Sequence, residues 1–139
     1  MSNPITHNYL LITTLVLLML GGCGKQTSNL TCEDFKEGKF KRLDSDGIKS
    51  YEIHRTKNQQ KEVFDDGKFD LLEIQYFDNC SYLLTYLDTN EDPFEEWVNA
   101  SGGILVEMIE IKSDTFYYLA SIETDSMQFE QKGMLIKLE

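Results

Sequence analysis

The sequence predicts an all-β domain with one short helix, built as an eight-stranded antiparallel meander that closes, fully or in part, into a barrel. Three observations predict this fold. From residue 38 onward, apolar and polar residues alternate with a period of two, as in strands with one buried face. Turn-forming sequences separate these short segments at regular intervals, and only one segment has helical spacing. Sequential short strands of this kind favour a meander that closes into a barrel.

The expected strands follow one another along the chain. In residues 72–76 and 82–86, every second residue is apolar or aromatic. Asp66-Gly67 falls between two strands, and Asp-Gly suits the positive φ angles of a tight hairpin turn. In residues 104–111 both faces are largely apolar, so the sequence does not decide which face is buried. The expected strands cover residues 38–43, 50–56, 61–64, 69–77, 81–87, 104–112, 115–123 and 129–138.

A single helix is expected after the fifth strand. Asp92 is a good N-cap residue, and Pro93 suits the first helical position. Phe94, Trp97 and Val98 have the spacing of one helical face, which predicts an amphipathic helix with one apolar side. The glycines at 102 and 103 end the helix.

The first 22 residues have the features of an export signal. Residues 9–20 form an apolar, uncharged run that would rise only about 18 Å as a helix, short of the roughly 30 Å of a hydrocarbon core. This length fits the core of a signal peptide. Leu20-Gly21-Gly22-Cys23 resembles the lipobox, at which bacterial lipoproteins are cleaved before the cysteine that receives lipid. We therefore expect a signal peptide over residues 1–22, lipid on Cys23, a tether over residues 23–31 and a folded domain over residues 32–139.

Two further features bear on the predicted cellular location. Residues 1–9 contain no Lys or Arg, which leaves an ordinary secreted protein or an uncleaved anchor as alternatives. Gly24 rather than Asp follows the lipidated cysteine, so the inner-membrane retention rule of enteric bacteria gives no reason for retention. The expected location is the outer membrane of the cell envelope. The sequence does not decide between its periplasmic face and its outer surface.

The formal charge of −11 falls entirely on the part of the chain after residue 22. Such an acidic domain is repelled by phosphate backbones, and it has no basic stripe. The sequence therefore excludes nucleic acid as a partner.

Two cysteines remain once Cys23 is assigned to the lipid. In an oxidising compartment Cys32 and Cys80 favour one disulfide, and two buried free thiols are the alternative. No partner histidine accompanies either residue, so a catalytic cysteine is not expected.

Several short segments together resemble a known family. Residues 34–40 open the domain after Cys32, and Arg55 is followed by Gln59, Gln60 and Glu62. Segments 75–84, 110–118 and 131–138 complete the pattern. This order is similar to small exported lipoproteins of the Bacteroidota that have a lipocalin-like antiparallel sheet and no established function. Tyr76 stands where a Trp is common in that family.

The resemblance implies a fold and a location in the cell envelope, but it implies no catalytic residue. Some members of the family are labelled as a topoisomerase IV subunit. An exported, acidic chain of 139 residues is far too short for strand passage.

The candidate ligand contacts are residues expected to face the barrel interior. If Arg55 shares a strand face with Ile53, it contacts an anionic ligand or forms an ion pair with Glu62 on the next strand. The inward aromatic residues line a cavity or simply fill the barrel, and the sequence leaves both possibilities open. These aromatic candidates are Tyr76, Tyr82, Tyr86, Phe116 and Tyr118.

No catalytic, metal or cofactor site is expected. After residue 22 the only histidine is His54, too few ligands for zinc, and no nucleophile elbow or phosphate-binding glycine loop occurs. We expect a non-enzymatic binding module held at a membrane by Cys23, with a small apolar or anionic ligand in the barrel. The alternative is a structural component that binds an envelope protein through its outer surface.

Overall fold

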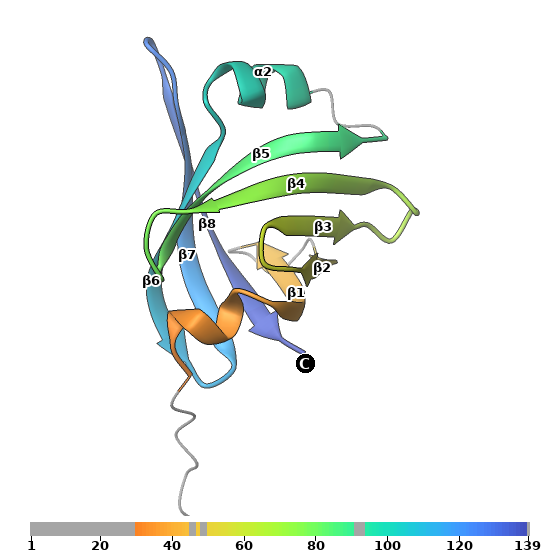
Figure 1. The fold of residues 1–139 in the computed structure, drawn as a ribbon, viewed down its shortest axis with the longest axis vertical. Helices are drawn as coiled ribbons and strands as arrows, with labels where there is room; N and C mark the ends of the chain where they lie inside the picture. The colour runs from red at the N-terminus through yellow and green to blue at the C-terminus, as the bar shows by residue number, and fades with distance from the viewer. Residues whose placement is uncertain (1–29, 45–46, 48–49, 91–93, 139) are drawn as a thin grey trace, which may run out of the picture.

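The computed structural model describes residues 30–44, 47, 50–90 and 94–138. Eight strands pair in chain order and the last pairs with the first, so the sheet closes into a barrel (Figure 1). Every pair is antiparallel, which confirms the predicted all-β meander. The strands are β1 (Gly38–Asp44), β2 (Ser50–Arg55), β3 (Gln59–Val63), β4 (Phe69–Tyr76), β5 (Ser81–Thr89), β6 (Ile104–Lys112), β7 (Thr115–Glu123) and β8 (Gln128–Lys137).

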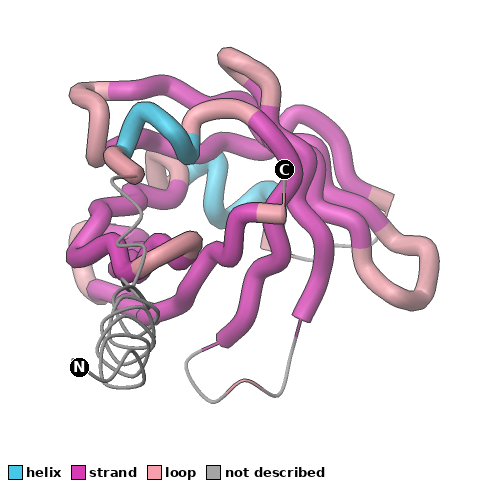
Figure 2. The backbone as a smooth tube through the Cα atoms, turned by 90° about the horizontal axis from the view of Figure 1, so that it is seen from below, coloured by secondary structure: helices cyan, strands magenta, loops and turns pink. Residues whose placement is uncertain are grey.

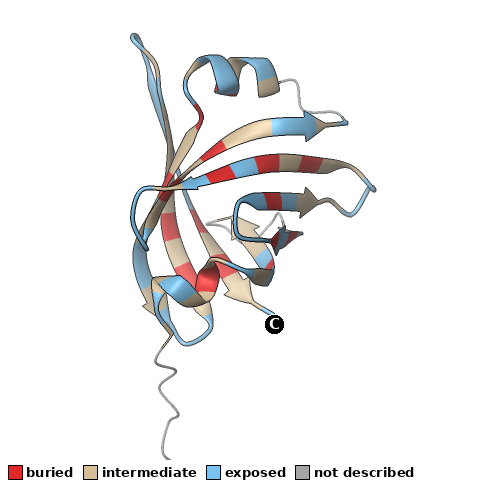
Figure 3. Cartoon of the chain, viewed as in Figure 1, coloured by how far each residue is buried: buried red, intermediate tan, exposed pale blue. Residues whose placement is uncertain are grey.

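The alternating sequence pattern explains why these segments form strands. In β4, Asp70, Leu72 and Ile74 are buried, whereas Glu73 and Gln75 are exposed. Successive strand residues point to opposite faces, so one set of side chains fills the interior and the other meets solvent. Figure 3 shows this alternation as buried segments separated by exposed ones along the strands.

The third strand begins earlier than the sequence predicts. We expected it to start at residue 61, but it starts at Gln59. Gln60 lies opposite Arg55 in the β2–β3 register, and only 2 % of Gln60 is exposed. A polar residue inside the barrel interrupts the apolar alternation, which is why the sequence pattern missed the start of this strand.

The predicted helix is present but shorter than expected. Helix α2 spans Glu95–Ala100, and Phe94 rather than Asp92 occupies its N-cap position. Asp92 and Pro93 lie outside the described residues. Val98 is buried and Trp97 packs edge-on against Phe129, but Phe94 is 62 % exposed and does not share that buried face.

The barrel has two different ends. The closed end carries the 3₁₀ helix η2 (Cys32–Phe35) and the turns that join β2 to β3, β4 to β5 and β6 to β7. The open end carries α2, the β3–β4 turn and the β7–β8 hairpin (Figure 1). Seen from below in Figure 2, the strands run around a common interior.

Aromatic side chains fill the closed end. Phe35 of η2 lies 5.8 Å from Phe40 of β1 and 5.3 Å from Phe116 of β7, measured between ring centroids. At most 2 % of each of these residues is exposed. Because η2 inserts Phe35 into the barrel, this end is plugged by packed apolar surface.

A cysteine pair joins η2 to the β4–β5 turn. The sulfur atoms of Cys32 and Cys80 lie within bonding distance, and their Cα atoms are 5.2 Å apart. The structure therefore brings together the two cysteines predicted to form a disulfide. The predicted signal peptide over 1–22, the predicted lipid site at Cys23 and most of the predicted tether fall outside the described residues. Within the described ranges, no helix has the length and hydrophobicity needed to cross a membrane.

Candidate ligand-binding cavity

The barrel interior between the plug and the open end is hollow. A cavity of about 340 Å³ lies there, within the size range of small-molecule sites. Phe129, Glu130 and Gln131 at the start of β8 line it and are exposed, so the cavity opens to solvent beside them. Its apolar lining comes mainly from β4 to β8 and consists of Ile53, Leu72, Leu84, Ile104, Val106, Ala120, Ile122, Phe129 and Leu135.

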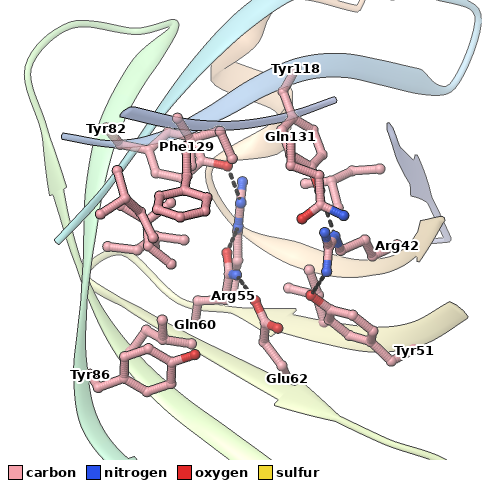
Figure 4. A pocket seen from close by; sticks show the side chains of 18 of the residues that line it. Arg42, Tyr51, Arg55, Gln60, Glu62, Tyr82, Tyr86, Tyr118, Phe129 and Gln131 are labelled. Carbon is pink, nitrogen blue, oxygen red and sulfur yellow. Dashed lines mark hydrogen bonds between the residues drawn. The ribbon is translucent and has the colours of Figure 1, made fainter. Parts of the chain in front are cut away.

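Arg55 forms the inner part of the polar lining (Figure 4). Only 5 % of Arg55 is exposed. Its Nε donates to Gln60 Oε1 at 2.6 Å, its Nη1 donates to the Phe35 carbonyl oxygen at 3.0 Å, and its Nη2 donates to the Tyr82 hydroxyl. The guanidinium also lies 4.7 Å from the centroid of the Tyr82 ring and 5.5 Å from that of Phe40. Arg55 thus joins the packed plug to the cavity.

Arg42 forms the outer part of the polar lining. Its Nε donates to the Tyr118 hydroxyl at 2.6 Å, and its Nη1 donates to the Tyr51 hydroxyl. Its Nη2 lies 3.2 Å from the Asp44 carboxylate. Burial opposes the charge of Arg42, but the facing oxygen atoms of Tyr51, Tyr118 and Glu62 outweigh it and raise the pKa of this guanidinium. Arg42 therefore stays cationic.

Glu62 lies between the two arginines on the polar wall (Figure 4). Gln60 Nε2 donates to the Glu62 carboxylate at 2.6 Å, and the Tyr51 hydroxyl also hydrogen-bonds to it. Burial raises the pKa of Glu62, while these two hydrogen bonds and the charge of Arg42 act in the opposite direction. The Glu62 side chain is only half-buried, because it borders the cavity.

A chain of hydrogen bonds therefore runs along one wall. It leads from the Phe35 carbonyl through Arg55, Gln60, Glu62 and Tyr51 to Arg42. The chain comes from β1, β2 and β3, which face the apolar wall across the cavity. The site can thus contact polar groups on one side of a ligand and apolar groups on the other.

A glycine in β8 makes room for one member of the polar wall. Gly133 pairs with Tyr118 across the β7–β8 ladder. A Cβ atom at Gly133 would overlap the Tyr118 hydroxyl and lie 2.6 Å from Cζ. Burial raises the pKa of Tyr118 to about 12, although Arg42 favours the ionised form. The bare glycine backbone therefore lets a neutral tyrosine reach Arg42.

Four of the six predicted pocket residues line the cavity, namely Arg55, Tyr82, Tyr86 and Tyr118. The other two do not. Phe116 belongs to the plug at the closed end. Tyr76 donates its hydroxyl hydrogen to the Lys36 carbonyl oxygen at 3.2 Å and packs on Tyr82 behind the cavity. The sequence left open whether the barrel is filled or holds a cavity. The closed end is filled by aromatic side chains, whereas the part toward the open end holds a cavity.

The expected ion pair between Arg55 and Glu62 is not formed. Arg55 lies opposite Gln60 in the register, and Glu62 lies opposite Ile53, one inward position farther along the barrel. Gln60 fills the gap, accepting from Arg55 and donating to Glu62. The carboxylate therefore reaches Arg55 only through an amide.

Sequence reasoning missed several residues of the polar wall. Arg42 follows Phe40 by two positions, and Tyr51 precedes Ile53 by two, so each shares an inward face with a core residue. That phase could have identified both. Gln60 and Glu62 share the inward face of β3, which has no apolar alternation to show that they line a cavity. From the sequence, Glu62 was expected only as a possible ion-pair partner of Arg55.

Within the described residues, no group of three or more His, Cys, Asp or Glu side chains could hold a metal ion. Comparison with protein-family models, with curated proteins and with solved structures finds no match to the chain.

Proposed function

We propose that this domain is a binding protein that holds one small amphipathic ligand inside the barrel and performs no chemistry on it. The cavity with one hydrogen-bonding wall and one apolar wall is the observation that supports this proposal. A ligand with a polar group and an apolar body satisfies both walls at once, since buried polar groups need partners and apolar surface gains from leaving water.

The size of the cavity limits the ligand. Its volume of about 340 Å³ is near the lower end of the range for ligand sites, roughly 300–1,000 Å³. A molecule with a single short chain or a small ring system fits this volume. A lipid with two long acyl chains does not, so we expect a metabolite or a single-chain amphiphile.

Filling the cavity tests the proposal. Ala120 on β7 lines the apolar wall, so Ala120→Leu should occupy part of the space and weaken binding at least tenfold. Ala100→Leu, on the exposed end of α2, is a matched control and should leave affinity unchanged. Trp97 packs on Phe129 beside the opening, so its fluorescence can report ligand entry.

The ligands tested would be a panel of ten-carbon amphiphiles together with small molecules extracted from the native envelope. Saturable binding that Ala120→Leu abolishes and Ala100→Leu preserves supports the proposal. Binding that neither substitution alters would place the ligand outside the barrel, and no binding by any member of the panel would contradict a carrier function.

We further propose that the barrel is held at the outer membrane by lipid on Cys23. The apolar run at 9–20 and the sequence Leu20-Gly21-Gly22-Cys23 support this address. Mass spectrometry of the N-terminal peptide should find an acylated cysteine as its first residue, and Cys23→Ser should release the protein from the membrane fraction. An intact segment 1–22 in the purified protein would overturn the proposal.

A partner protein at the outer surface is the second candidate. Phe94 is 62 % exposed and Phe129 is 51 % exposed, both toward the open end. Phe94→Ser would separate the two functions, because it should reduce binding of a protein partner and leave cavity binding intact.

A further inference from the structure

The arginine next to the plug has no direct counter-ion among the described residues. Arg55 is almost fully buried, and its hydrogen-bond acceptors in the described chain are a carbonyl, an amide and a hydroxyl, all neutral. None of the described ion pairs includes it. A buried cation is costly unless an opposite charge compensates it. Because Arg55 also lines the cavity, a bound anion could supply that charge.

The nearest acidic group on the same wall is Glu62. It forms no ion pair with a described cation, and it is linked to Arg55 only through Gln60. Arg42, the other arginine of the wall, is already paired with Asp44. In its ionised form, Glu62 can balance the charge of Arg55 only indirectly, through Gln60.

An anionic ligand would change this balance. With Glu62 ionised, the four charged groups of Arg42, Asp44, Arg55 and Glu62 sum to zero. A ligand anion placed on the polar wall then adds an uncompensated negative charge beside Glu62, and like charges in a shared site favour protonation of one of them. With Glu62 neutral, the same anion restores the balance.

We propose that the ligand carries a single anionic head, which binds on the wall between Arg55 and Arg42, and that Glu62 takes up one proton as the anion binds. This inference rests on the proposed function, because it names the ligand class and the pH response of the same cavity. The head lies deep on the polar wall, and the apolar body extends along Ile104 and Ile122 toward the opening beside Phe129.

The surroundings of Glu62 favour such a proton exchange. Burial already raises the pKa of Glu62, and a ligand anion beside the carboxylate would raise that pKa further. A protonated carboxyl group can still accept from Gln60, and it gains a hydrogen to donate to the ligand head. The titratable or charged groups that act on Glu62 are Arg42 of β1, Tyr51 and Arg55 of β2, Asp70 of β4, Tyr82 of β5 and Tyr118 of β7.

The experiment compares three ten-carbon probes by titration calorimetry at pH 8 and pH 6. Decanesulfonate stays ionised throughout, so any pH dependence of its affinity comes from the protein. Decanoate offers the carboxylate head, and decanol offers the same chain without charge. Repeating the titrations in buffers of different ionisation enthalpy counts the protons taken up.

The variants isolate Glu62. Glu62→Gln keeps the shape of the side chain and fixes it as neutral, while Glu73→Gln removes the same charge from the exposed face of β4. Thermal unfolding of each variant shows whether it folds.

We expect decanesulfonate affinity to rise as the pH falls from 8 to 6, by up to roughly tenfold per pH unit, with uptake of one proton. In Glu62→Gln the affinity should be high at both pH values, without proton uptake, and Glu73→Gln should behave like the wild type. Decanol should show no pH dependence in any variant.

The results that would overturn the anion and proton proposal differ from those that would overturn the carrier function. If decanol binds in the cavity as tightly as decanesulfonate, or if Glu62→Gln and Glu73→Gln respond alike, the anion and proton proposal is wrong and the carrier function stands. If none of the three probes binds and Ala120→Leu changes nothing, the carrier function itself fails.

Discussion

The two ends of this barrel use the same strands for opposite purposes. On β1, Phe40 is sealed in the plug, and two residues later Arg42 borders the cavity. On β7, Phe116 packs against Phe35, while Ala120 leaves space four residues farther along. The inward face of one strand thus stabilises the fold at the closed end and forms a binding surface at the open end. Packed aromatic side chains are concentrated at the closed end, where η2 inserts. Hydrogen bonds between inward side chains are concentrated along the cavity wall.

Removing an aromatic ring from each end would test this division most strongly. Phe40→Ala should lower the free energy of unfolding by about 3–5 kcal/mol, because it leaves a void in packed surface. Phe129→Ala should cost less than about 1 kcal/mol, since half of that side chain is already exposed. Urea unfolding of the domain measures both values. Similar losses from the two substitutions would mean that the ends do not differ in packing.

Opening the cysteine pair should have the next largest effect and should be confined to the closed end. The Cys32→Ser, Cys80→Ser double variant is expected to lose about 2–4 kcal/mol of stability, because the unfolded chain gains freedom. Ligand affinity should not change, since the cavity lies beyond the plug. Thiol titration of the unfolded, unreduced domain is the accompanying measurement, and two free thiols would show that no disulfide exists.

Alkaline pH should weaken the open end. Burial raises the pKa of Tyr118 to about 12, above its usual value near 10, so the folded state holds a proton that the unfolded state releases. The stability contribution is complete below pH 10 and is lost as the pH rises through 12, amounting to at most about 3 kcal/mol. Tyr118→Phe should make the decline in stability shallower. Tyr117→Phe, on the outward face of β7, should keep the slope of the wild type.

Crowding the polar wall should lower the stability by less than opening the plug or removing the cysteine pair. Gly133→Ala places a methyl group on the Tyr118 hydroxyl, which should cost about 1–3 kcal/mol and displace the tyrosine from Arg42. The double variant with Tyr118→Phe removes the hydroxyl and should recover part of the loss. A double-mutant cycle without coupling between the two positions would contradict the proposed contact.

The sequence predicted the architecture well because the fold depends on a repeated pattern. Leu72 and Ile74 on β4 alternate with polar residues, and such alternation specifies both the strand and its buried face. The helix was placed correctly, but its first residue was not, because cap preferences indicate an end of a helix only within a few positions.

The cavity was less predictable for a physical reason. Alternation shows that Tyr82 and Phe116 point inward, but it does not show whether another element fills the space between them. Here that element is η2, whose Phe35 reaches Phe116 and leaves Tyr82 at the boundary of the cavity. The partner of Arg55 depends on strand register, which places Gln60 rather than Glu62 opposite it. Neither η2 insertion nor register can be read from a two-residue period.

The entry point of the chain also has a mechanical consequence. The described chain enters the barrel through η2, which is fixed to the β4–β5 turn by Cys32 and Cys80 and lies opposite the open end. A force applied through the N-terminal segment would therefore act on the plugged end, and the opening beside Phe129 lies at the opposite end of the barrel. If lipid on Cys23 anchors the protein as proposed, the rate of ligand exchange should not depend on the number of residues between Cys23 and η2.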